Sequence, residues 1–307
     1  MVKANLVVMD KKIKLVATLL LALPLTLLTS CGGEDIVVEE AIEEVVVEAV
    51  PERNETYYRI PSPDEMFAFI KESGLPFNGE LLNPIKNVNR YSDPKMKALN
   101  FGVYSADLAY TAAFKEFNET AKYFLTIQKL AESVGISAAF DPATIERASA
   151  NLENADSLVA ITNTSYFNVV DYLEQNEQGD KLGIIASAGW LETVYVIANS
   201  IDYAKDKDAV NRLADQKFAL DNLLDYMADY KENADVADVL SWFNELELVF
   251  ANLAEKESKG SGISLKKKES GKMVLGGGSS ISMSEEQFNA IKDKVNQIRN
   301  NIVKTEA

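Results

Sequence analysis

Two segments of the chain each place an acidic residue three positions before a tyrosine. Asp107 precedes Tyr110, and Glu192 precedes Tyr195. Residues three apart in an α-helix lie on the same face, so each carboxyl group would share a face with its phenol. A carboxyl group buried on such a face needs a partner, because otherwise its pKa rises. With Trp190 nearby as an aromatic platform, these residues could line a polar cleft that binds a small ligand.

A weak internal repeat relates the two pairs. Asp107 aligns with Glu192 at an offset of 85 residues, and small residues precede both acids, among them Gly102 and Gly189. A duplicated helical hairpin would bring the two acids together, with Tyr104 as a second aromatic platform. The alternatives are a chance similarity, acids on a solvated face, and acids that the phenols satisfy within the core.

The composition excludes several kinds of site. The chain has 307 residues, no His and one Cys. It therefore has no Ser-His-Asp triad, no Cys-His dyad, no His-bearing zinc or haem site and no intrachain disulfide. The glycine-rich segment Gly276–Ser280 lacks the Lys-Ser/Thr of a phosphate-binding loop. The sequence predicts neither a metal nor a cofactor.

The N-terminal segment has the organisation of a signal peptide. A cationic stretch, Lys11–Lys14, precedes an apolar run of 14 residues, Leu15–Leu28. This run is shorter than the roughly 18–20 residues that span a bilayer. It ends in Leu28-Thr29-Ser30-Cys31, which resembles the lipobox of bacterial lipoproteins. The resemblance implies removal of residues 1–30 and acylation of Cys31; the alternatives are a secretory signal with a chance cysteine and a single-span anchor.

The same resemblance predicts attachment to the outer membrane. Gly32, rather than Asp, follows Cys31, and by similarity to the enterobacterial sorting rule this favours the outer membrane over retention in the inner one. Two lipid chains suffice for stable anchoring without a transmembrane helix. Orientations towards the periplasm and towards the cell surface both stay open, and either Met1 or Met9 could begin the chain.

The charge of the chain argues against nucleic acid as a partner. The net charge is −16, and removal of residues 1–30 would leave 27 basic and 46 acidic residues, a net charge of −19. Nucleic-acid binding depends on clustered Lys and Arg, so such an acidic chain is a poor candidate for it. Residues 31–56 are rich in Glu and Val, and we expect them to form a mostly disordered tether between the lipid and the body. An acidic helix that binds a partner is the alternative.

The body, residues 57–256, has the apolar spacing of helices throughout. Short connections between neighbouring helices favour antiparallel packing. The sequence therefore predicts an all-α fold, either an antiparallel multi-helix bundle or an array of helical hairpins. The expected helices cover residues 63–73, 95–117, 119–134, 154–176, 181–203, 206–232 and 234–256, with a further helix opened by Asp141-Pro142.

Residues 257–283 differ in composition from the body. Two short apolar segments flank a Lys-rich centre there, which predicts a small β-hairpin near residues 263–275 or else a flexible loop. Ser284-Glu285-Glu286-Gln287 is then a capping box for a C-terminal helix over residues 284–307. An apolar stripe along that helix requires a groove, which we expect on the body itself.

The body resembles uncharacterised all-helical lipoproteins of Gram-negative bacteria, through the lipobox and the segment Asn100–Tyr110. This resemblance implies no catalytic residues. The leading hypothesis is a non-enzymatic, lipid-anchored module that binds an envelope protein or a small ligand. The alternatives are a carboxylate-dependent hydrolase of envelope material or glycans, and a structural envelope protein. An enzyme would place two carboxyl groups in a cleft, whereas a binding module would present an exposed apolar patch or an aromatic-lined groove.

Overall fold

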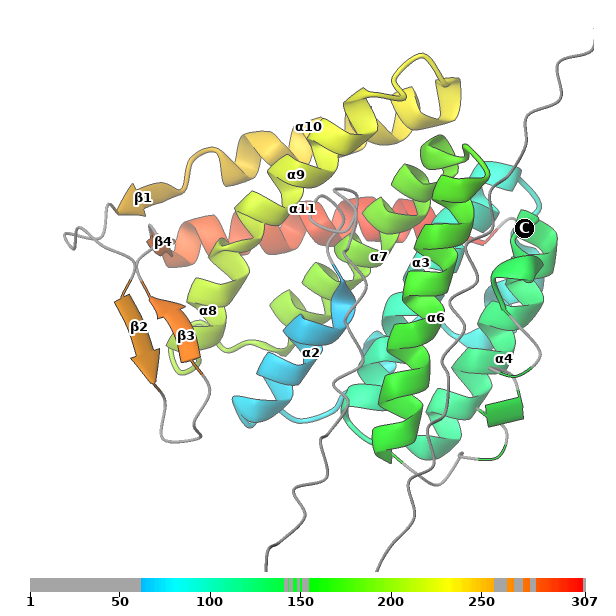
Figure 1. Cartoon of the computed structure of the whole chain (residues 1–307). Coiled ribbons are helices and arrows are strands. Elements are labelled where there is room, and N and C mark those ends of the chain that lie inside the picture. Colours follow the sequence, from blue (N-terminus) through cyan, green and yellow to red (C-terminus); the bar gives the residue numbers. More distant parts are fainter. Residues whose placement is uncertain are drawn as a thin grey trace, which may run out of the picture. The chain divides into compact units, whose positions relative to one another are not determined.

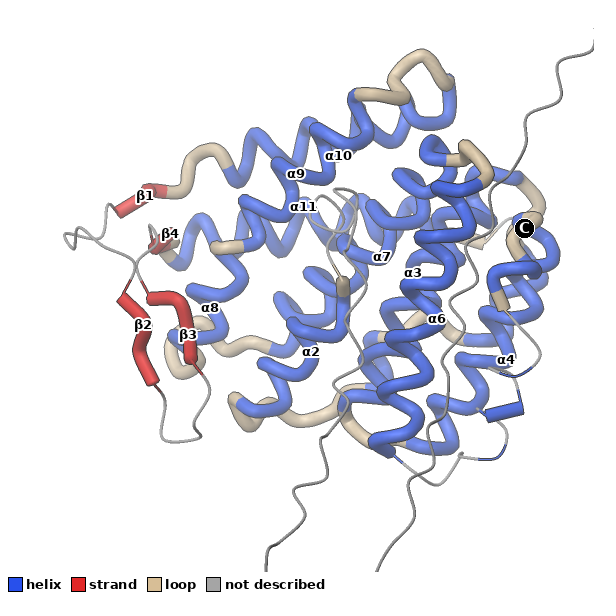
Figure 2. Tube along the Cα trace, viewed as in Figure 1, coloured by secondary structure: helices blue, strands red, loops and turns tan. Residues whose placement is uncertain are grey.

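The computed structural model describes residues 62–140, 155–256, 264–267, 273–276 and 280–305, together with helical residues 143, 146–147 and 150. The predicted signal peptide, Cys31, the predicted tether and the Asp141-Pro142 helix start lie outside the described residues. Helices make up most of the described chain (Figure 2), which confirms the predicted all-α fold.

The helices follow one another along the chain, and most of the connections between α6 and α10 are short. They are α2 (Pro63–Glu72), α3 (Pro94–Ala113), α4 (Phe117–Val134), α6 (Ala155–Gln175), α7 (Gly179–Ser200), α8 (Lys207–Ala214), α9 (Gln216–Ala228), α10 (Ala234–Phe250) and α11 (Glu285–Val303). Three 3-10 turns connect them, η1 (Gly79–Leu81), η2 (Ile85–Arg90) and η3 (Ser137–Ala139).

Helices α3 and α7 form the centre of the body (Figure 1). Both are buried along most of their length. They touch backbone to backbone at Gly102, where an added Cβ would lie only 2.1 Å from the carbonyl oxygen of Ile185. Glycine is therefore required for this close approach. Contacts advance in the same direction along both helices, from Gly102 beside Gly189 to Tyr110 beside Ser200, so the central pair runs parallel.

Helix α7 is the one helix of the described residues that is long and apolar enough to cross a membrane. Of the most apolar stretch of 18 residues in α7, 89% is buried within the body. The core helix of a globular protein passes the same test of length and composition, so the apolar character of α7 is explained by its central position.

Two expected helices are shorter in the structure. The helix expected over residues 206–232 is divided at Asp215 into α8 and α9, and the Asp215 carboxyl accepts a hydrogen bond from the Ile281 backbone. The helix expected over residues 234–256 ends at Phe250. Residues Ala254–Lys256 instead form strand β1, which pairs antiparallel with β4 (Ser280–Ser282). These strands are too short to show a period in the sequence.

The predicted β-hairpin and the predicted capping box are both confirmed. Strands β2 (Ser264–Lys267) and β3 (Met273–Gly276) pair antiparallel, with Leu265 opposite Leu275. At the start of α11, the Ser284 side chain accepts from the Gln287 backbone, and the Gln287 side chain accepts from the Ser284 backbone. By contrast, the Ser62 side chain makes no cap hydrogen bond at α2, which begins with Pro63 as expected.

Helix α11 lies against α7 and α10 (Figure 1). Its apolar stripe is buried, namely Phe288, Ile291, Val295, Ile298 and Ile302. Contacts of Asn296 with Asn199 and of Arg299 with Glu192 show that α11 runs antiparallel to α7. The last helix of the chain therefore covers one side of the central helix pair.

Candidate functional site

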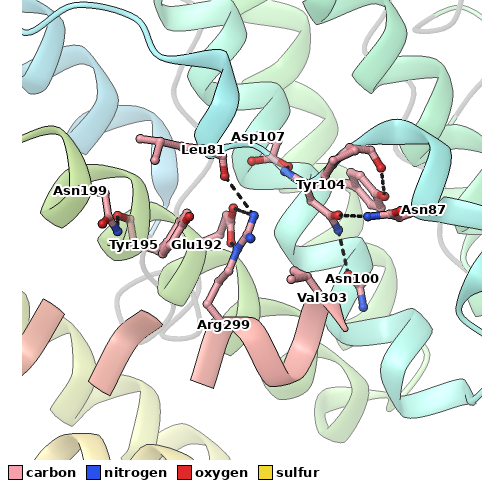
Figure 3. A network of polar contacts seen from close by, with 12 residues as sticks. Leu81, Asn87, Asn100, Tyr104, Asp107, Glu192, Tyr195, Asn199, Arg299 and Val303 are labelled. Atoms are coloured by element: carbon pink, nitrogen blue, oxygen red, sulfur yellow. Dashed lines mark hydrogen bonds and ion pairs between the residues drawn. The ribbon is translucent and has the colours of Figure 1, made fainter. Parts of the chain in front are cut away.

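The two acids singled out in the sequence meet where α3, α7 and α11 come together. Asp107 on α3 and Glu192 on α7 are both 0% exposed, and their carboxyl groups lie within hydrogen-bonding reach of each other. Arg299 reaches the same point from α11 (Figure 3). We call Asp107, Glu192 and Arg299 the carboxyl site.

Arg299 binds Glu192 through two parallel hydrogen bonds. Its Nε donates to Oε2 at 3.0 Å, and its Nη2 donates to Oε1 at 2.9 Å. Such a two-bond pair is the strongest arrangement between guanidinium and carboxylate. The same Nη2 donates to the Leu81 carbonyl at 3.0 Å, and the guanidinium lies 4.4 Å from the centre of the Tyr195 ring. The Glu192 charge is thus fully paired.

Asp107 has fewer partners than Glu192. Its Oδ2 accepts one hydrogen bond, from the Asn83 backbone at 3.1 Å. Its Oδ1 is buried and accepts no hydrogen bond from the described residues. Burial and the neighbouring Glu192 charge raise the pKa of Asp107 well above its ordinary value, against the opposing effect of Arg299. Burial also raises the pKa of Glu192, where Arg299 opposes it directly.

Asn83 connects the carboxyl site to the end of α11. Its side-chain amide donates to the Tyr91 hydroxyl and to the Asn100 carbonyl oxygen, both at 3.0 Å. Asn100 in turn donates to the Ile302 carbonyl at 2.9 Å, and Tyr91 donates to the Val303 carbonyl at 3.2 Å. The last carbonyls of a helix have no partner within it, so these buried side chains fix the C-terminus of α11.

The polar cleft expected around the two acids is absent from the described body. Neither carboxyl group is exposed at all, and Arg299 is only 7% exposed. The two carboxyl groups have the inward position that an enzyme would need, but no cleft among the described residues leads to them.

The two tyrosines of the acid–tyrosine pairs do not bind their acids. The Tyr110 ring packs against Phe67 and Phe77, with ring centres 5.1 and 5.0 Å apart, and its hydroxyl accepts from the Asn78 backbone. Tyr195 is half-buried beneath Arg299. Tyr104 is fully buried and donates to the Pro84 carbonyl at 3.0 Å, so it is not a ligand platform.

Trp190 lies on the other side of the central helices, where it lines an apolar cavity. The cavity has a volume of about 50 Å³ and lies between α3, α4, α6 and α7. We call it the aromatic cavity, after the rings of Phe101, Phe140, Tyr166 and Trp190 that line it. The indole nitrogen of Trp190 donates to Gln216 at 3.1 Å, and its ring also packs near Phe243 and Phe250.

An open depression of about 660 Å³ adjoins the aromatic cavity between α2, α3 and α6. The two share Ala109, Thr162 and Asn163 in their walls. Ala112 and Ala113 widen the depression because they have small side chains, and Lys71 lies at its edge. The aromatic cavity therefore has an accessible neighbour, unlike the carboxyl site.

Sequence reasoning missed Arg299, Asn83 and Asn100. One signal was present for Arg299, which lies four residues after Val295 and three before Ile302. A charged residue within the apolar stripe of a helix indicates a buried partner. In the described residues, no group of three His, Cys, Asp or Glu side chains is placed to hold a metal ion.

Comparison with known proteins found no match to this chain. No protein-family model matches the chain, and neither does any curated protein or any solved structure.

Proposed function

We propose that this protein is a lipid-anchored, non-enzymatic module of the bacterial cell envelope that binds an apolar ligand in the aromatic cavity. The observation that carries the proposal is the cavity itself, which is lined by four aromatic rings and shares wall residues with an open depression. Apolar walls with a few polar groups at the entrance are typical of small-molecule sites. Thr162 and Asn163, which line both the cavity and the depression, are such polar groups here.

The dimensions favour a narrow ligand. A volume of about 50 Å³ is well below the roughly 300–1,000 Å³ of sites for drug-sized molecules. Only the end of an extended chain or a small ring fits inside, while the remainder of the molecule lies in the depression of about 660 Å³. A single acyl chain meets both conditions, so a fatty acid or the chain of a lipid is the ligand that we propose.

The location follows from the N-terminal sequence alone. The lipobox resemblance at Leu28–Cys31 supports an acylated Cys31 that holds the body at the outer membrane, facing the periplasm or the cell surface. The predicted tether of residues 31–56 would let the body reach molecules near that membrane. Binding of acyl chains is consistent with such a location.

The carboxyl site is the observation that favours the alternative, a carboxylate-dependent hydrolase. Two adjacent inward carboxyl groups with raised pKa values are typical of catalytic acids. Both are closed to solvent, and Arg299 occupies both oxygens of Glu192. A hydrolase would need an opening that the described body lacks, so we rank this function second. A purely structural envelope protein ranks third, because it would not need the cavity.

The test is a titration of the full chain with cis-parinarate, a fluorescent fatty acid, at a concentration below that at which it forms micelles. We expect saturable binding of one probe per chain. Ala186 lines the aromatic cavity and Ala109 lies where it meets the depression. Ala186→Leu and Ala109→Leu fill this space, and each should weaken binding about tenfold or more, the equivalent of about 1.4 kcal/mol.

The matched control is Ala237→Leu, which adds the same side chain at an exposed position of α10. It should leave binding unchanged. Circular dichroism checks that each variant is folded. If both filled variants bind the probe as tightly as the control does, the aromatic cavity is not the binding site and the proposal is wrong.

A further inference from the structure

The carboxyl site contains two acids and one cation in a space closed to solvent. If Asp107 and Glu192 were both ionised beside Arg299, the site would carry one uncompensated negative charge. Both acids are 0% exposed, and an uncompensated charge at such a position is so costly that the group takes up a proton instead. The geometry therefore requires one proton at the site.

The hydrogen bonds identify the oxygen that carries this proton. Glu192 already accepts two hydrogen bonds from Arg299, which favours its ionised form. The Oδ2 atom of Asp107 accepts from the Asn83 backbone, whereas its Oδ1 atom has no partner among the described residues although it is buried. A proton on Oδ1 converts this unsatisfied acceptor into a donor, and Glu192 lies within its reach.

We propose that Asp107 and Glu192 hold a single proton between them, carried on Oδ1 of Asp107 and donated to the Glu192 carboxylate, and that this proton keeps α11 docked on the α3–α7 pair. The proposal is independent of ligand binding in the aromatic cavity. It makes the contact between the last helix and the core dependent on a proton.

The other titratable groups around the site do not supply a positive charge that would balance the second acid. They are Tyr104 from α3, Tyr91 beside η2, Tyr123 from α4 and Tyr195 from α7. Burial raises the pKa of each of these phenols, so all four stay neutral at physiological pH. Among the residues that the structure describes, Arg299 on α11 is the cation that acts on the two acids.

The sign of the pH dependence follows from the raised pKa of Asp107. Above about pH 4 the unfolded chain has released this proton, while the folded chain still holds it. The unfolded state then binds fewer protons, so stability falls as pH rises, until the pH passes the pKa of the folded site. Over that window the unfolding constant should rise by up to about tenfold per pH unit from this group.

The direct experiment is infrared spectroscopy of the full chain at neutral pH. An exposed carboxyl group is ionised there, so a carbonyl stretch of a protonated acid reports a buried proton. We expect this band in the natural sequence and not in Asp107→Asn, whose amide replaces the protonated acid with nearly the same shape. Absence of the band in the natural sequence would show that Asp107 is ionised and would overturn the proposal.

The second measurement tests the role of α11. Hydrogen-exchange protection of the α11 amides should fall in the natural sequence as the pH rises above about 4 towards the pKa of the folded site, relative to the protection of the α4 amides and after correction for the intrinsic exchange rate. In Asp107→Asn it should stay constant, and this variant should be at least as stable as the natural chain at neutral pH. Equal pH dependence in both chains, or a less stable Asp107→Asn, would contradict a proton-dependent contact.

Discussion

The two sides of the α3–α7 pair differ in chemistry and in access. On one side, α11 covers a carboxyl site whose acids are 0% exposed. On the other side, α6 and α4 leave the aromatic cavity, which adjoins an open depression. Asp107 and Leu108 are neighbours in the chain but face these two different sides. Asp107 and Glu192 are thus buried, whereas the aromatic cavity, whose walls are mainly apolar, adjoins an open depression.

The largest effect should come from Arg299→Ala, which tests whether the carboxyl site is structural. This change leaves Glu192 buried without its cation, and breaking a buried ion pair in this way costs about 3–5 kcal/mol. Urea denaturation measures the loss of unfolding free energy. The control is Lys294→Ala, also on α11, whose partner Glu245 is 63% exposed; this change should cost less than about 1 kcal/mol. Equal costs would show that the carboxyl site does not stabilise the fold.

A second large effect should come from Gly102→Ala, which would force helices α3 and α7 apart. The added Cβ would lie 2.1 Å from the Ile185 backbone oxygen, and backbone cannot move aside without shifting a helix. We expect a loss of about 1–3 kcal/mol or more in thermal or chemical unfolding.

Gly183→Ala on α7 is the matched variant for Gly102→Ala. Its Cβ would meet the flexible Met227 side chain at 3.1 Å, which can move, so the cost should be smaller. A Gly102→Ala protein as stable as Gly183→Ala would mean that α3 and α7 do not touch as described.

A moderate effect should come from Asn100→Ala, which removes the buried donor to the Ile302 carbonyl at the end of α11. A buried carbonyl left without a partner costs about 1–3 kcal/mol. Exchange of the last α11 amides should rise first, because they lie beside the lost contact. The control is Asn289→Ala at an exposed position of α11, which should leave the hydrogen exchange of these amides unaltered. The same rate of hydrogen exchange in both variants would contradict a role for Asn100 in fixing α11.

The smallest effect on the fold should come from Cys31→Ser, which tests the predicted anchor and leaves the body untouched. The unfolding free energy should not change, while the protein should move from the membrane to the soluble fraction of the cells because it cannot be acylated. Mass spectrometry of the native protein should find acyl chains on Cys31 and no residues 1–30. An unmodified thiol or an uncut leader would refute the anchor.

The sequence predicted the helices better than the site. Apolar residues at helical spacing located α3, α4, α7 and α11 within a few residues, because that spacing is local. The repeat also placed Asp107 and Glu192 in equivalent positions, and the structure brings them together. Whether their face is solvated depends on what covers it, and the covering residue Arg299 lies 107 positions from Glu192. Local patterns cannot reveal such a contact, nor the pairing of β1 with β4.

The most direct test of this account compares three proteins in one titration with cis-parinarate: the natural sequence, Asp107→Asn and Ala186→Leu. If the aromatic cavity binds the ligand and the carboxyl site only holds the fold, Asp107→Asn will bind as the natural sequence does and Ala186→Leu will bind about tenfold more weakly. Loss of binding in Asp107→Asn with full binding in Ala186→Leu would contradict the account, because it would place the function at the acids.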